Sequence, residues 1–298
     1  MTTSKLSLGP LLFNWDADKT RDFYFAIADE APVDHVYLGE VVCAKRLAGK
    51  DYLPEVIKRL TKAGKQVILS GLMLVLDDRD MKMVEDLADM AGDYLVEAND
   101  LSAVSLLRGQ DHAIGPFVNI YNEATLKYYE DGGAKRISLP PELPASSLRA
   151  LAKVAHADLE VQVFGRMPLA ISARCYHARA HKLHKDGCQY ICDRDPDGLT
   201  VETMDGQAFL TINGLQTLSY SYCNLLAELP ELQAMGIHNF RLSPHDVNMV
   251  KICSVFRDRL DGKIDRKTAN DILDAEMFAL EFSNGYYHHV AGRTMVGP

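Results

Sequence analysis

Eight short β-rich segments recur along this chain, and their spacing constrains the fold more than any other feature. Most are separated by about 10 to 20 residues of helical character. The expected strands are residues 6–13, 35–39, 66–72, 93–98, 113–119, 134–139, 158–165 and 237–243. Strands that alternate with helices indicate a parallel sheet, and a count of eight favours a closed (β/α)8, TIM-barrel-like fold over an open doubly wound sheet.

Amphipathic patterns in the intervals predict the helices. Residues 52–63 (YLPEVIKRLTKA) space their apolar side chains at i, i+3, i+4 and i+7, which places them on one helical face. Gly64 then provides a C-terminal stop. Residues 80–91 and 145–154 predict two further helices by the same reasoning.

One long interval interrupts the repeat. We expect a single domain, residues 1–298, in which residues 166–236 form an insertion between the seventh and eighth strands. Asp205-Gly206 between two β-rich runs predicts a hairpin, and residues 222–234 predict a helix. Such an insertion would lie on the C-terminal face, where barrel enzymes build their sites.

Three of the six cysteines, Cys175, Cys188 and Cys192, lie in this insertion with the spacing C-x12-C-x3-C. Thiolates with basic neighbours can bind a metal ion or an iron–sulfur cluster, and a site without an open position needs a fourth ligand. Buried packing and a disulfide are the alternatives, and the polar flanks and free-thiol context disfavour both. Spacing alone does not separate zinc from iron–sulfur.

Cys43 is the best candidate for the fourth ligand. It follows the second expected strand and therefore lies on the same C-terminal face as the insertion. Cys253 falls on the apolar stripe of the expected last helix, and Cys223 begins the helix expected in the insertion. Both of these are expected to pack in the core.

Charge and composition exclude several function classes. The net charge is −9, which argues against nucleic acid as the main partner, because a phosphate backbone needs a basic face. No run of 18 apolar residues predicts a membrane span. The first residues lack the apolar core of a signal peptide, so we expect a cytoplasmic protein.

Three strings resemble the collagenase-like peptidase family, and more specifically its UbiV branch, bacterial proteins of oxygen-independent ubiquinone biosynthesis. They are RCYHARAHKLHKDGCQYICDRDPDGL, YLGEVVCAKR and DGQAFLTINGLQTLS, and the resemblance extends over essentially the whole chain. It implies a [4Fe-4S] cluster held by four cysteines, which match Cys43, Cys175, Cys188 and Cys192.

The resemblance also implies partners. Proteins of this branch form a heterodimer with a UbiU-like paralogue, and the pair is required to hydroxylate the quinone ring without molecular oxygen, with prephenate implicated as oxygen donor. A UbiT-like lipid-binding protein acts in the same pathway. The resemblance therefore implies that the chain is a subunit of an oxygen-independent hydroxylase. The alternative is a structural role, in which the cluster fixes the insertion to the barrel and the chain serves as a scaffold for its paralogue.

Proteolysis is the less favoured activity, despite the family name. The sequence contains neither HExxH nor GxSxG, and cysteines that hold a cluster cannot act as nucleophiles. A serine triad assembled from distant positions stays open. The nucleotide-binding P-loop and GxGxxG patterns are also absent from the sequence.

Polar residues near expected strand ends are candidates for substrate binding. Arg166 and Arg241 could receive a dicarboxylate by bidentate pairing, with structural ion pairs as the alternative. Asn119 is the third candidate. The side chains of His177, His181 and His184 would share a helical face, where they could bind a metal, although a solvated surface is the more ordinary interpretation.

Overall fold

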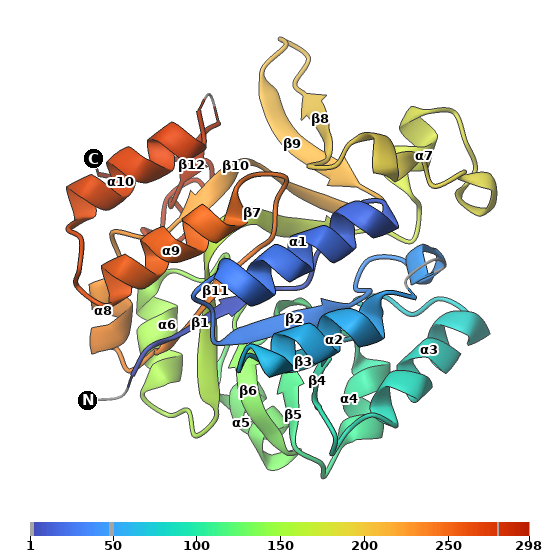
Figure 1. The fold of residues 1–298 in the computed structure, drawn as a ribbon, viewed down its shortest axis with the longest axis horizontal. Coiled ribbons are helices and arrows are strands. Elements are labelled where there is room, and N and C mark those ends of the chain that lie inside the picture. The colour runs from blue at the N-terminus through green and yellow to red at the C-terminus, as the bar shows by residue number, and fades with distance from the viewer. Residues whose placement is uncertain (1–2, 48–50, 279, 298) are drawn as a thin grey trace.

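The computed structural model describes residues 3–47, 51–278 and 280–297. Eight parallel strands form a closed barrel (Figure 1), because β11 pairs with both β1 and β7. They are β1 (Lys5–Leu8), β2 (His35–Gly39), β3 (Gln66–Ser70), β4 (Leu95–Ala98), β5 (His112–Ile114), β6 (Ala134–Ser138), β7 (Asp158–Ile171) and β11 (Asn239–Leu242). The expected (β/α)8 barrel is confirmed, and each of its strands overlaps an expected segment.

Helices surround this barrel and cover the outer face of its strands (Figure 1). The longer ones are α1 (Ala17–Glu30), α2 (Leu53–Lys62), α3 (Asp78–Ala88), α4 (Leu101–Leu107), α5 (Glu123–Asp131), α6 (Ala145–Ala152), α9 (Met249–Leu260) and α10 (Arg266–Glu276). Helix α2 buries Val56 and Leu60, one turn apart, against the strands. The side chains of Asp16, Asp77 and Asn122 accept backbone N–H groups at helix starts.

The strands alternate apolar side chains toward the helices with polar side chains toward the barrel axis. In β2, Val36 and Leu38 belong to the hydrophobic core, whereas the hydroxyl of buried Tyr37 bonds Glu160 of β7. Glu160 and Glu97 are fully buried and flank Arg241 of β11. These side chains therefore form a layer of paired charges inside the barrel.

Strand β7 continues past the barrel and carries the segment between it and β11. Its extension pairs antiparallel with β10 (Gln216–Asn224), which pairs with β9 (Ala208–Asn213) and then β8 (Leu199–Glu202). The expected Asp205-Gly206 hairpin joins β8 to β9. This hairpin and α7 (Tyr176–Ala180) project together from one side of the barrel (Figure 1).

The prediction of a helix over residues 222–234 is wrong for the first half of that range. Cys223 lies in β10, which pairs with β7 and with β12 (Phe282–Ser283), and only α8 (Leu229–Ala234) is helical. Pro230 lies in the first turn of α8, where the missing N–H carries no cost. Cys253 is buried in α9 as expected, but α10 follows, so α9 is not the last helix.

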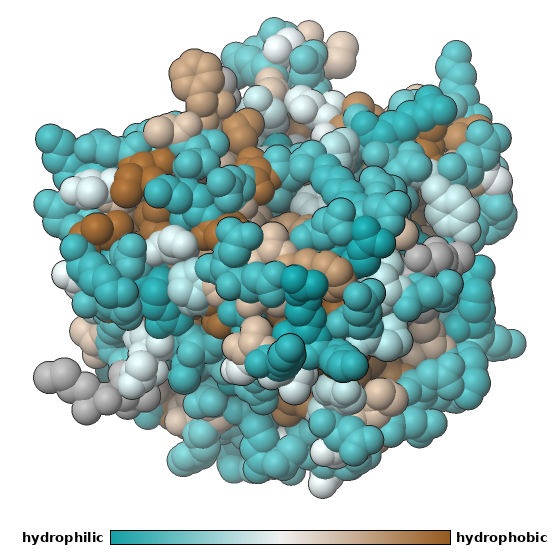
Figure 2. Space-filling view, in the orientation of Figure 1, coloured by the Kyte–Doolittle hydropathy of each residue, from teal (hydrophilic) through white to brown (hydrophobic). Residues whose placement is uncertain are grey.

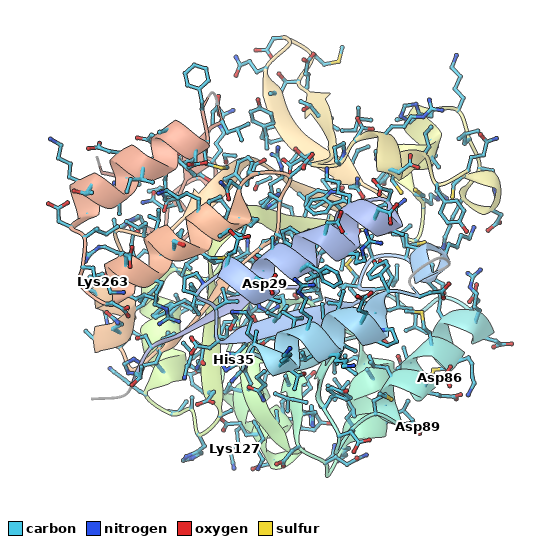
Figure 3. The ribbon with its side chains drawn as sticks, viewed as in Figure 1. Asp29, His35, Asp86, Asp89, Lys127 and Lys263 are labelled. Atoms are coloured by element: carbon cyan, nitrogen blue, oxygen red, sulfur yellow. The ribbon has the colours of Figure 1, made fainter. Side chains whose placement is uncertain are left out.

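Figure 2 shows hydrophilic residues over most of one face of the molecule, with apolar patches between them. In Figure 3, Asp86 and Lys127 lie near the edge of the molecule, whereas buried His35 lies at the start of β2. Within the described residues, no helix is long and apolar enough to cross a membrane.

Candidate iron–sulfur centre

One small pocket is lined by Cys43, Cys175, Cys188 and Cys192, the four cysteines singled out from the sequence. Cys43 lies in the loop after β2, and the other three lie in the segment that follows β7. Cys192 is buried, and the other three side chains are half-buried. The fold therefore brings together a residue of the barrel and three residues far from it in the sequence.

Local turns direct these cysteines toward the pocket. Cys175 begins α7, where its Sγ accepts the N–H of Ala178 at 3.4 Å. Between Cys188 and Cys192, Gln189 and Tyr190 both adopt left-handed backbone angles, with φ of 51° and 55°. Such angles cost non-glycine residues about 1 kcal/mol or more each, so this tight turn is held by its surroundings.

Two polar side chains connect the segments that carry the cysteines. The Nζ of Lys45, next to Cys43, donates to the carbonyl of Lys185 at 2.7 Å and pairs with Asp186 at 3.1 Å. The buried amide of Asn213 in β9 donates to the carbonyls of Cys192 and Asp195, both at 3.0 Å. These contacts hold the cysteine loops against the barrel and β9.

A buried cation borders the pocket. Arg46 is only 4% exposed, and its guanidinium donates to the carbonyl of Leu12 and to Oδ1 of Asn213, both neutral acceptors. Burial alone would lower the pKa of Arg46, but the nearby charges of Cys192, Glu40 and Cys43 raise it. A buried guanidinium beside four cysteines is suited to a set of thiolates.

Burial raises the pKa of Cys43, Cys175 and Cys192, and the Arg46 charge only partly offsets this for Cys192. Gly214, with φ of 68°, lines the same pocket, and a Cβ there would lie 2.5 Å from the Arg46 guanidinium. The pocket thus depends on a glycine at that turn.

A second polar cluster lies near the barrel mouth, and it was not anticipated. Asp197 pairs with Arg166 at 2.9 Å and with His245 Nδ1 at 2.6 Å, and it accepts the hydroxyl of Tyr222. Burial opposes ionisation of Asp197, but the charges of His245 and Arg166 and the hydrogen bonds outweigh it and lower its pKa. His245 follows β11, so the strand-end rule that selected other polar residues could have found it.

The two arginines proposed for substrate lie in these buried networks. Arg166 pairs with Asp197, and Arg241 pairs with Glu97 at 2.5 Å and Glu160 at 2.6 Å. Both side chains are about 5% exposed, and the chain's own carboxylates occupy them. Both arginines therefore take part in structural ion pairs, the alternative to substrate binding that the sequence left open. Substrate binding by either arginine stays a prediction.

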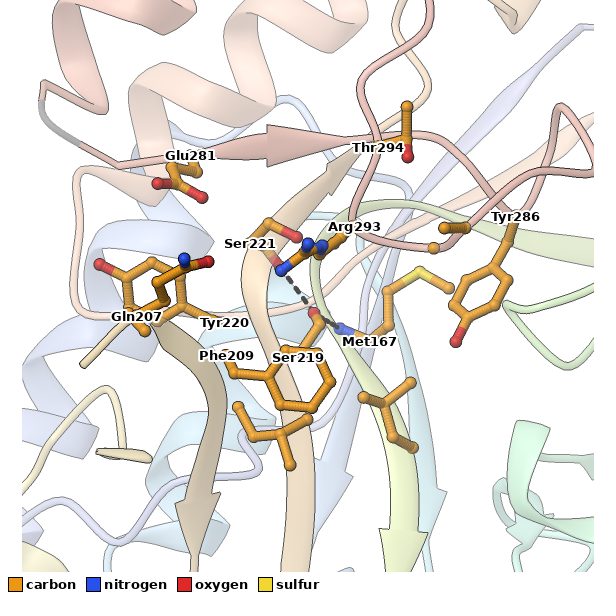
Figure 4. Close-up of a pocket in the computed structure, with 15 residues that line it drawn as sticks. Met167, Gln207, Phe209, Ser219, Tyr220, Ser221, Glu281, Tyr286, Arg293 and Thr294 are labelled. Atoms are coloured by element: carbon orange, nitrogen blue, oxygen red, sulfur yellow. Dashed lines mark hydrogen bonds between the residues drawn. The ribbon is translucent and has the colours of Figure 1, made fainter. Parts of the chain in front are cut away.

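Asn119, the third substrate candidate, is exposed in a left-handed turn with φ of 62° after β5. It lines a pocket with Tyr121 and Glu142. A separate groove lies between β7, β9, β10 and the C-terminal segment, with Phe209 and Tyr286 among its lining residues (Figure 4). Neither pocket includes any of the four cysteines.

Comparison with known structures finds similar barrels at low sequence identity. "The Structure of the U32 Peptidase Mk0906" matches with a TM-score of 0.47 and 12% identity, over 82% of this chain and 95% of that one. Dihydropteroate synthase from Thermus thermophilus matches with a TM-score of 0.42 and 13% identity, over 88% and 93% of the two chains. D-Psicose 3-epimerase from Clostridium cellulolyticum matches with a TM-score of 0.40 and 12% identity, over 93% of this chain and 99% of that one.

The sequence also matches a described protein family over nearly its whole length. The family description is "Peptidase family U32", and the match covers residues 18–296, which include every barrel strand except β1 and all four cysteines. The chain therefore belongs to peptidase family U32.

Proposed function

We propose that this chain is an iron–sulfur protein of the UbiV type and a subunit of an oxygen-independent hydroxylation system in ubiquinone biosynthesis. The observation that carries the proposal is the single pocket lined by Cys43, Cys175, Cys188 and Cys192 beside a buried cation. A [4Fe-4S] cluster needs four cysteine thiolates. Four thiolates give such a cluster a net negative charge, which the Arg46 guanidinium would offset.

The spacing of the thiols supports a cluster over a single zinc ion. Zinc holds each thiolate at about 2.3 Å, which places the sulfurs only about 3.8 Å apart in a tetrahedron. Among the described residues, three ligand atoms within 4.8 Å of one another occur in a His/Asp group and in no set of three cysteines. In every set of three of these cysteines, at least one pair of ligand atoms is therefore more than 4.8 Å apart, and a cubane, whose thiolates lie at the corners of a larger tetrahedron, can accommodate such a pair.

The chain's residues have separate tasks at this centre. The four cysteines would hold the cluster, which supplies one-electron transfer when bound. Arg46 supplies fixed positive charge, and Asn213 fixes the backbone of the Cys192 turn. Because Cys192 is buried and the other cysteines are half-buried, protein covers much of the site, which slows oxidative loss of a cluster.

The role in the pathway rests on the resemblance of the cysteine segment and the hairpin to UbiV proteins. It assigns a UbiU-like paralogue as the heterodimer partner and a UbiT-like protein as a further component, in the cytoplasm. Asn119 is the substrate-contact candidate whose side chain is exposed. Arg166 and Arg241 could contact a substrate only by exchanging their present carboxylate partners.

The peptidase alternative finds little support in the Asp197–His245 pair. His245 Nδ1 lies 2.6 Å from Asp197, as in a catalytic triad, but Nε2 accepts the backbone N–H of Arg166 at 2.9 Å. A histidine whose Nε2 lone pair is already occupied cannot take a proton from a serine. This pair is better suited to tying β7, β10 and the β11 loop together.

The proposed function is tested by deleting the gene and complementing it. Without oxygen, the deletion strain should lack ubiquinone, and with oxygen it should make normal amounts. Wild type and Cys253→Ala should restore anaerobic synthesis, whereas Cys175→Ala should not, because Cys253 lies in α9 outside the pocket.

Two outcomes would overturn the proposal. Full anaerobic synthesis with a folded, cluster-free Cys175→Ala variant would leave only a scaffold role. Peptide cleavage by the purified chain, abolished by one serine or histidine substitution, would restore the peptidase interpretation.

A further inference from the structure

Three ligand-type side chains meet beside the cysteine pocket without belonging to it. One ligand atom from each of His177, His181 and Asp195 lies within 4.8 Å of the others. The residues come from the two segments that hold Cys175 and Cys192. His177 lies in α7, His181 lies at its C-terminal end, and Asp195 follows the 3-10 turn Ile191–Arg194.

The buried histidine of this group makes no well-aligned hydrogen bond within the described residues. His177 is 0% exposed, and neither Nδ1 nor Nε2 has a partner in good hydrogen-bonding geometry there. Its Nε2 atom lies 2.9 Å from Oδ2 of Asp195, an ion-pair distance, and the backbone of Ile212 lies beside the ring. A bound ion shared with Asp195 would give this buried imidazole a well-aligned partner.

The surroundings hold the group in place for a common ligand. His177 and His181 are four residues apart, and their rings stack at 5.5 Å with an interplanar angle of 24°. Asn213 and the N–H of Gly198 bond the backbone carbonyl of Asp195.

We propose that His177, His181 and Asp195 form a binding site for one divalent metal ion of the borderline class, such as Zn²⁺ or Fe²⁺, separate from the four cysteines. Two imidazoles and one carboxylate are the donor set that such ions take in proteins. This inference does not depend on the proposed function, because it uses none of the cysteine thiols.

Three protein ligands leave at least one position of the ion open. An ion held this way can bind water or an oxygen-bearing ligand there. His181 is exposed, and Asp195 is partly exposed, so the open position can face solvent. A bound ion would also join α7 to the Cys192 turn and stiffen the loops that carry the cysteines.

Cobalt titration of the anaerobically purified full-length chain tests this site. Iron and sulfide are counted first, and if no sulfide is present the free thiols are alkylated before the titration. Bound Co²⁺ should reach about one ion per chain and show ligand-field absorption without thiolate charge-transfer bands. Zn²⁺ should displace it.

Variants then locate the ion. His181→Ala and Asp195→Asn should each weaken Co²⁺ binding more than about 100-fold, since even outer-shell changes cost 10- to 100-fold. His184→Ala is the matched control, because this side chain is 83% exposed in the same loop and lies outside the group. It should bind Co²⁺ as wild type does.

Three results would overturn the inference. They are no stoichiometric Co²⁺ binding, unchanged binding in both variants, or binding accompanied by thiolate charge-transfer bands and lost on alkylation. A missing cluster with intact Co²⁺ binding would contradict the proposed function and leave this site standing.

Discussion

At the scale of single residues, the side chain of Asn213 links three parts of the cysteine pocket. Its side chain bonds Arg46 and the carbonyls of Cys192 and Asp195 while fully buried. Removing it takes away the partner of the Cys192 carbonyl and of one N–H group of the buried Arg46 guanidinium, whereas the Asp195 carbonyl keeps the N–H of Gly198. Each unsatisfied buried group costs about 1–3 kcal/mol.

Asn213→Ala should therefore lower the free energy of unfolding by more than about 2 kcal/mol and also reduce the iron bound per chain. Urea denaturation and iron analysis measure the two effects. The control is Asn239→Ala, because Asn239 is also buried and bonds the Leu159 carbonyl, far along the chain from the cysteines. It should lose stability but keep its iron, and equal iron loss in both variants would contradict the positioning role.

His35 gives a pH-dependent prediction that does not involve the cysteines. Burial, followed by the charge of Arg136, lowers the pKa of this histidine to about 4. The folded state binds the proton less readily than the unfolded state, so this contribution is present above pH 6.5 and is lost as the pH falls toward 4. Between pH 7.5 and 5 it amounts to about 2 kcal/mol.

Urea unfolding of wild type and His35→Gln at these two pH values measures that contribution. The stability lost by wild type on acidification should exceed the loss in His35→Gln by about 2 kcal/mol. Equal losses in the two proteins would show that His35 titrates normally in the folded state.

At the scale of elements, two glycine turns of the β8–β9–β10 sheet form a natural comparison. Gly206 and Gly214 both have positive φ, 79° and 68°, but a Cβ at Gly206 meets nothing within 4 Å, whereas one at Gly214 would collide with Arg46. Alanine carries the same backbone penalty of about 1 kcal/mol at both positions. Only Gly214 adds a collision at the pocket.

Gly214→Ala should therefore lower the iron content and the thermal midpoint, while Gly206→Ala should lower the midpoint slightly and keep the iron. Iron analysis and thermal unfolding of the two purified variants provide the comparison. Full iron retention in Gly214→Ala would mean that the β9–β10 turn does not shape the site.

The strands of the barrel could be predicted because each is a short apolar run bounded by turn residues. The residues of β10 around Tyr222 and Cys223 alternate polar and apolar side chains, which is a strand signal, but they run directly into LLAEL, whose helix-like pattern favours a helix over the whole stretch. The local pattern is therefore ambiguous, and pairing with β7 on one side and β12 on the other decides that these residues form a strand.

At the candidate site, the four cysteines could be selected from clustering and strand-end placement, whereas Asp197 could not. Asp197 lies in a loop with no helical or strand pattern, and it meets Arg166, Tyr222 and His245 only through the folded β7–β10 sheet. The buried partners of Arg241 were likewise hidden, because Glu97 and Glu160 come from separate barrel strands.

At the scale of the whole molecule, the chain is a barrel with a cysteine-lined pocket formed by the loop after β2 and the segment that follows β7. If the chain works with a UbiU-like paralogue, co-expression of the two should yield a stable heterodimer, measured by size-exclusion chromatography with light scattering. The isolated chain should not hydroxylate a quinone precursor. Hydroxylation by this chain alone would contradict the need for the partner.

The central claim is that four particular cysteines hold an iron–sulfur cluster, and anaerobic iron and sulfide analysis of purified protein tests it most directly. We predict about four iron and four sulfide per chain. Both should be largely lost in each Ala variant of Cys43, Cys175, Cys188 and Cys192, and both should be retained in Cys253→Ala, whose thiol is buried in α9. Stoichiometric zinc without sulfide, or loss of iron in Cys253→Ala but not in Cys43→Ala, would contradict the account.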